Sequence, residues 1–141
     1  MKIAYTRPDG GVSVVVSGPM LDGETDADFR VRVYAQSIPA DATNVSELTE
    51  VQELPDREFR DAWVMTDGVP EINLPKARVI MAKRIETARQ EAMRDILLRE
   101  ALGEDVAAEK ARVAGVNSAD IVAGAKNHRE LKMPDVLRKG K

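Results

Sequence analysis

The side chains that could carry catalytic or metal chemistry in this sequence are few. There is one histidine, His128, and there are no cysteines. A zinc site built from several histidine and cysteine ligands would therefore need more than one chain, and no nucleophile lies at a spacing that pairs it with His128 as a general base. His128 falls in a polar segment, where we expect an exposed side chain. The sequence thus predicts no metal and no cofactor.

Carboxylates occur in close groups at three places, and paired carboxylates can do acid–base work or hold a cation. The same residues also fit solvated loops and helix starts, so we predict no catalysis from them and expect that the chain is not an enzyme. Gly10-Gly11 is too short to bind a phosphate as a glycine-rich loop does. Asp22-Gly23-Glu24 lacks the regularly spaced oxygen ligands of an EF-hand loop. The three groups are Asp26 with Asp28, Asp56 with Glu58 and Asp61, and Glu104 with Asp105.

Phe59 and Trp63 could form a stacking platform for a nucleobase or a sugar. The chain has only one tryptophan, two phenylalanines and two tyrosines. In a chain so poor in aromatic residues, we expect Phe59 and Trp63 to be buried in the core of a small sheet.

Charge is divided unevenly along the 141 residues, although the net charge is only −3. Residues 1–73 carry fourteen acidic and six basic side chains, a net charge of −8, whereas residues 74–141 carry ten acidic and fifteen basic side chains, a net charge of +5. This division fits a solvated arginine-rich helix face, complementary contacts within or between chains, or a basic arm for nucleic acid. No apolar run approaches the roughly 18 residues of a membrane span, and the polar stretch after Lys2 predicts no signal peptide.

Turn signals divide residues 1–73 into short elements. Pro8-Asp9-Gly10-Gly11 separates two β-prone runs and predicts a hairpin over residues 1–17. Apolar and polar residues alternate over residues 25–36 as they do in a strand. Thr25 followed by acidic residues is typical of a helix start, however, and we favour a helix. A strand is expected over residues 44–53. Asp67-Gly68 predicts a second hairpin with a type I′ turn, whose return strand is limited to a sheet edge by Pro70.

Residues 74–102 show the clearest periodicity in the chain. Apolar residues recur at steps of three or four, which predicts one long helix of about 40 Å, with Gly103 at its end. Such a helix is long for a small domain, so we expect its alanine-rich stripe to form an interface with another protein or with copies of the chain, unless it packs on its own chain. The proposed interface residues are Ala77, Met81, Ile85, Ala88, Ala92 and Ile96.

Shorter elements are expected after the long helix. These are a helix over residues 104–113, another over residues 118–125, a capping box from Asn127 to Glu130, and a last turn after Pro134 before the basic end Arg138-Lys139-Gly140-Lys141. The sequence therefore predicts an α+β chain. An acidic β-rich domain with one helix occupies residues 1–73, and a basic helical region occupies residues 74–141.

Residues 54–63, with the sequence LPDREFRDAW, resemble a motif of small tailed-bacteriophage proteins, roughly L-P-x-D-R-x-F-R-N-A-W. The likeness continues through Asp67-Gly68, through Leu74-Pro75-Lys76-Ala77-Arg78, and through the two ends of the chain. Asp61 stands where the motif has asparagine, and the Pro55-Asp56 step is one residue tighter.

The resemblance implies a non-enzymatic virion component near the tail or head–tail region, or a tail-assembly factor. Its partners would be other phage structural proteins or copies of itself, in the virion or in the host cytoplasm during assembly. It also implies a helix over residues 25–36. The alternative that stays open is a nucleic-acid-associated phage protein that uses the basic helix.

Overall fold

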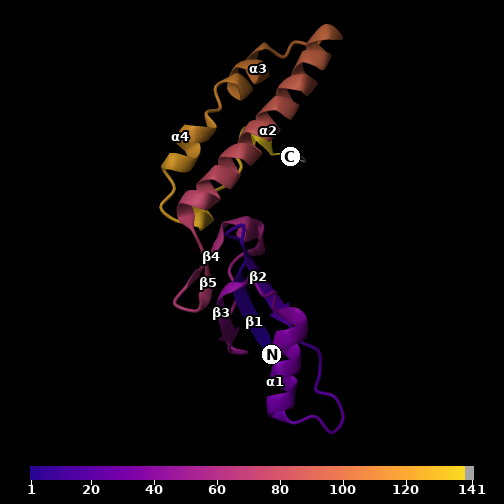
Figure 1. Ribbon diagram of the computed structural model, residues 1–141. Helices are drawn as coiled ribbons and strands as arrows, with labels where there is room; N and C mark the ends of the chain where they lie inside the picture. The colour runs from indigo at the N-terminus through magenta and orange to yellow at the C-terminus, as the bar shows by residue number, and fades with distance from the viewer. Residues whose placement is uncertain (139–141) are drawn as a thin grey trace. The chain divides into compact units, whose positions relative to one another are not determined.

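The computed structural model describes residues 1–138 and has the α+β architecture that the sequence predicts (Figure 1). The chain divides into two compact units, Met1–Asn73 and a second unit that begins at Leu74. The first unit holds the strands and one helix, and the second holds the long helix and the short C-terminal helices. Among residues 1–138, no helix combines the length and apolar character needed to cross a membrane.

An antiparallel three-stranded sheet organises the first unit. Its strands are β1 (Lys2–Thr6), β2 (Val12–Val16) and β3 (Thr43–Leu48), in the order β2-β1-β3. The predicted hairpin joins β1 to β2. Its turn is closed by the Asp9 carboxylate, which accepts a hydrogen bond from the Gly11 amide at 2.8 Å, and by Gly10, whose φ of 85° suits glycine.

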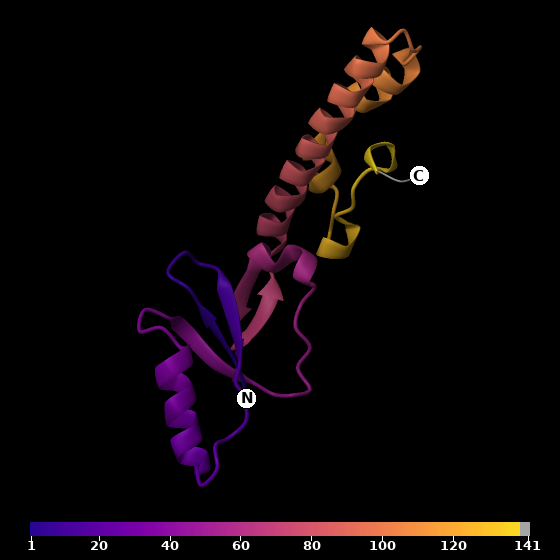
Figure 2. The same cartoon turned by 90° about the vertical axis from the view of Figure 1, so that its right-hand side faces the viewer.

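Helix α1 (Asp26–Ser37) packs on one face of this sheet, as Figure 2 shows. The helix starts as predicted, because the Thr25 hydroxyl accepts a hydrogen bond from the Asp28 amide at 3.2 Å. The apparent strand alternation disappears in the helix, since residues two apart point to different sides. Val33 is therefore buried, while Val31 is 70% exposed. The Tyr34 hydroxyl donates to the Glu47 carboxylate of β3 at 2.9 Å.

The other face of the sheet is covered by a 3-10 segment, η1 (Arg57–Ala62), and by the hairpin of β4 (Trp63–Thr66) and β5 (Val69–Ile72). Asp67 and Gly68 both have positive φ, which confirms the predicted turn. Trp63 packs in one cluster with Ala4, Val12 and Leu48. Phe59 and Trp63 are 1% and 2% exposed, so the predicted core positions are confirmed and neither ring can serve as a stacking platform.

The strand expected over residues 44–53 is shorter than predicted. β3 ends at Leu48, and the Thr49 amide then donates to the Gln52 side-chain oxygen at 2.8 Å, which turns the chain. Val51, which lies within the range expected for the strand, is 88% exposed. A bulge also interrupts the pairing of β1 with β3, where Asn44 takes a positive φ of 50°.

Helix α2 (Leu74–Ala101) runs the length of the second unit, and α3 (Ala107–Ala114) and α4 (Ser118–Ala123) pack along it (Figure 1). At its end the amide of Gly103 donates to the Glu100 carbonyl and that of Glu104 to the Arg99 carbonyl, a Schellman motif with Gly103 at φ 92°.

Two short 3-10 segments, η2 (His128–Glu130) and η3 (Asp135–Leu137), follow α4. The predicted capping box of Asn127 and Glu130 is confirmed. Of the basic end, positions 139–141 lie outside the described residues.

Candidate functional site

The apolar stripe of α2, which we expected to meet a partner, is buried within the chain. Ala77, Met81, Ile85 and Ile96 are at most 2% exposed, and Ala88 and Ala92 are half-buried. Apolar side chains of the short C-terminal elements, including Val113 and Val122, are buried along with them. Most of the stripe therefore packs within its own chain, which is the alternative that the sequence left open, because the short C-terminal elements fold back along the helix.

The exposed apolar side chains of α2 lie elsewhere on the helix. Leu97 and Leu98 are 47% and 62% exposed, and Leu102 follows at the helix end. Two ion pairs form along the helix, Glu86 with Arg89 at 3.0 Å and Asp95 with Arg99 at 3.1 Å. They stabilise the helix by a few tenths of a kcal/mol each at most.

The residues considered for catalysis do not converge. Asp26 and Asp28 lie in the first turn of α1, and the Asp56 carboxylate accepts a hydrogen bond from the Glu58 amide at the start of η1. Within the described part of the chain, no three histidine or acidic side chains are grouped to hold a metal ion. His128 is half-buried, so the expectation of an exposed side chain is corrected.

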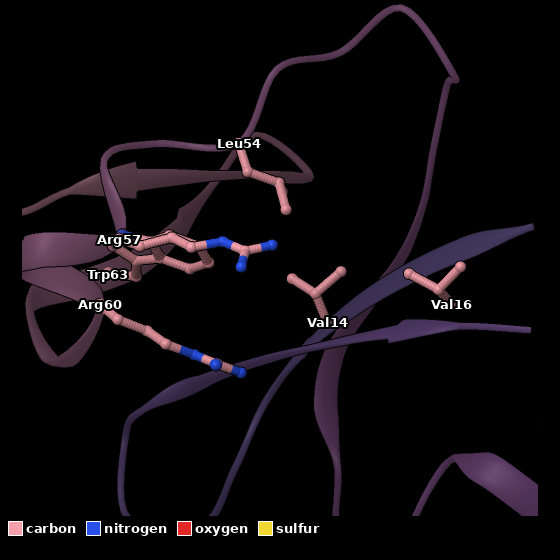
Figure 3. A pocket seen from close by; sticks show the side chains of 6 residues that line it. All are labelled: Val14, Val16, Leu54, Arg57, Arg60 and Trp63. Carbon is pink, nitrogen blue, oxygen red and sulfur yellow. The ribbon is translucent and has the colours of Figure 1, made fainter.

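A pocket of about 180 Å³ opens on the face of the first unit that carries η1 (Figure 3). We call it the arginine pocket, because the Arg57 and Arg60 side chains both line it. Figure 3 shows the Arg57 side chain reaching toward Val14 of β2, with Leu54 on one side and Arg60 on the other. The lining residues are Val14, Val16, Leu54, Arg57, Arg60 and Trp63.

Local structure accounts for this arrangement. The segment η1 is kinked at Phe59, whose φ of −108° and ψ of 33° are not helical, so Arg57 and Arg60 lie on either side of the kink. Both arginine side chains line the pocket, while Phe59 between them enters the core. The Trp63 indole Nε1 donates to the Asp56 carbonyl at 3.2 Å, which joins the end of η1 to its beginning.

The two pocket arginines differ from the other arginines of the unit. Arg7, Arg30 and Arg32 each form an ion pair with a carboxylate. Among residues 1–138, Arg57 and Arg60 have no side-chain hydrogen bond and no ion pair. Two such guanidinium groups beside an apolar wall have the chemistry to bind a carboxylate or phosphate that is attached to an apolar group.

A second feature of the unit is the loop over residues 18–24, between β2 and α1, which we call the anchored loop. The Arg32 guanidinium binds both oxygens of the Glu24 carboxylate, at 2.7 and 2.9 Å. The same carboxylate accepts the Leu21 amide at 2.9 Å, and the Glu24 amide donates to the Leu21 carbonyl at 3.1 Å. These bonds fix the loop while Met20 and Leu21 stay 41% and 59% exposed.

The Arg32 guanidinium and the Leu21 amide hold the pKa of Glu24 at about 2, below its ordinary 4.5. A carboxyl with a lowered pKa stabilises the fold above its unfolded pKa and loses that effect as the pH falls. We expect Glu24→Gln to lower the thermal unfolding midpoint at pH 7. The difference from wild type should shrink between about pH 4.5 and pH 2. Thermal melts by circular dichroism over this range measure it.

Asp41→Asn is the matched control for Glu24→Gln, because Asp41 is an exposed loop carboxylate with no ion-pair partner among residues 1–138. Its midpoint should follow that of wild type at every pH. A midpoint for Glu24→Gln that equals wild type at pH 7 would show that Glu24 does not hold the loop.

No protein-family model, no curated protein and no solved structure matches this chain.

Proposed function

We propose that the chain is a non-enzymatic structural or assembly protein of a tailed bacteriophage, associated with the tail or the head–tail region, and that it acts through contacts with other proteins. The observation that supports this most directly is the organisation of the phage-like segment 54–63. Its aromatic residues Phe59 and Trp63 are buried in the core, and its arginines Arg57 and Arg60 line the pocket with no side-chain partner among residues 1–138. The same segment thus supplies part of the core and two guanidinium groups that are available to a partner.

The charges of the second unit favour protein contacts over nucleic acid. Arg89, Arg99, Lys110 and Arg138 each pair with a carboxylate of their own unit, so these cations are partly neutralised within the chain. Nucleic-acid affinity depends on cations that are free to neutralise phosphates. Nucleic-acid binding would appear as a complex whose affinity falls steeply with added salt.

Mass spectrometry of purified particles and of isolated tail intermediates tests the proposal. We expect peptides of this chain in one of these fractions. We also expect a lower yield of infectious particles when the phage gene carries Arg57→Glu with Arg60→Glu. Val31→Ser is the matched control, because it changes an exposed residue of the same unit away from the arginine pocket.

The yield of the Val31→Ser phage should equal wild type. A deletion that leaves particle yield and composition unchanged, with no peptide of the chain in any fraction, would contradict the proposal.

A further inference from the structure

The arginine pocket defines the chemistry of the group that would fill it. The two guanidinium groups, unpaired among residues 1–138, favour an anion, and the side chains of Val14, Val16 and Leu54 favour an apolar group next to that anion. The surrounding unit carries a net charge of −8. That field opposes a polyanion such as nucleic acid, and it also opposes a second copy of the same acidic unit, so binding here must come from the local pairing of a carboxylate with the two guanidinium groups.

The anchored loop offers this combination of groups on the chain's own surface. Leu21 is exposed, and the neighbouring Asp22 carboxylate is exposed with no ion-pair or hydrogen-bond partner in residues 1–138. The bonds of Glu24 to Arg32 and to the Leu21 amide already order the loop. An ordered loop loses little conformational entropy when it binds, which favours its use as a contact.

We propose that the anchored loop of one copy of the chain binds the arginine pocket of a second copy, with Asp22 at the two guanidinium groups and Leu21 against the apolar wall. This inference deepens the proposed function, and rests on it, by naming a second copy of the chain as one of its protein partners.

The two surfaces are different parts of the same unit. The pocket lies on the face of the sheet that carries η1, and the loop leads from β2 to α1 on the other face. No loop residue lines the pocket of its own chain. The contact is therefore heterologous, and such contacts repeat from copy to copy into a ring or a filament.

Sedimentation velocity of the full chain over a concentration series tests the proposal. Wild type should form species that grow with concentration. Asp22→Arg alone, and Arg57→Glu with Arg60→Glu, should each raise the dissociation constant by at least about tenfold, since each places like charges in the contact. Leu21→Ser should weaken association in the same direction. Asp41→Arg and Val31→Ser are the matched controls and should associate like wild type.

A mixture of the two charge variants tests the pairing of Asp22 with Arg57 and Arg60 more directly than either variant alone. The Asp22→Arg copy keeps an intact pocket, and the Arg57→Glu/Arg60→Glu copy keeps an intact loop, so the mixture should associate although neither variant associates alone. A chain carrying all three substitutions has the charges exchanged and should regain association. Circular dichroism melts of each variant should match wild type, because all the changed side chains are exposed.

The proposal is overturned if wild type stays monomeric, if the charge variants associate like wild type, or if their mixture does not associate. Binding of single-stranded poly-dT that is lost in Arg57→Glu/Arg60→Glu, without self-association, would assign the pocket to nucleic acid and also overturn it. If self-association fails while the chain still purifies with particles, this inference fails and the proposed function stands.

Discussion

Replacing Trp63 by alanine should lower the free energy of unfolding of the first unit by about 3–5 kcal/mol, the usual cost of truncating a large buried aromatic side chain. Trp63 is 2% exposed and packs with Ala4, Val12 and Leu48 from all three strands of the sheet. Its removal leaves a cavity where the sheet meets the β4–β5 hairpin, and the Nε1 bond to the Asp56 carbonyl is lost. Urea unfolding followed by far-ultraviolet circular dichroism measures the change.

Trp63→Phe is the control for this prediction. It keeps most of the apolar volume and loses the indole hydrogen bond, so its cost should be clearly smaller, about 1–2 kcal/mol. Wild-type tryptophan fluorescence should show the blue-shifted maximum of a buried ring. A water-exposed emission maximum, or equal stability of wild type and Trp63→Ala, would contradict the packing.

Replacing Ile85 by glutamate should destabilise the second unit by at least about 4 kcal/mol, because the change removes apolar burial and places an unpaired charge in the core. Ile85 is completely buried on the stripe of α2. The main effect should therefore be on folding and not on association. Thermal and urea unfolding of the full chain, together with sedimentation of the folded fraction, measure both.

Leu98→Glu is the matched control on the same helix. Leu98 is 62% exposed, so its replacement should change the stability by less than about 0.5 kcal/mol. If Ile85→Glu folded as well as Leu98→Glu, the burial of the stripe by the C-terminal elements would be disproved.

Local signals explain why much of the fold could be predicted from the sequence. Asp67-Gly68 specifies a turn through its positive φ values, and Gly103 specifies a helix end in the same way. The N-cap signal at Thr25 predicted the helix α1 correctly, because a cap depends on adjacent residues. The spacing of Val31 and Val33 fits either a strand or a helix and so could not distinguish them. The end of β3 was missed because it depends on a side chain, Gln52, that folds back to the Thr49 amide.

The candidate site could not be predicted in the same way. Arg57 and Arg60 stand close together in the sequence, but only the folded path of the kinked segment η1 brings both to one pocket, and only β2 supplies Val14 as its wall. Their lack of partners also depends on where every carboxylate of the unit lies. The spacing of two arginines before a buried aromatic residue was the single available signal, and it does not by itself indicate a pocket.

The position of β2 has a consequence for aggregation when the first unit unfolds. Among residues 1–138, β2 pairs only with β1 and so forms an edge of the sheet, and its residues Val12–Val16 include no charge and no proline. Short segments of this kind join with one another into cross-β aggregates when they are released from a fold. Loss of the first unit's core would release this strand, and the resulting chains would be removed by precipitation or by cellular proteases rather than persist as soluble unfolded protein. The abundance of the protein in the cell that makes it would then depend on the core around β2 more strongly than on any exposed residue.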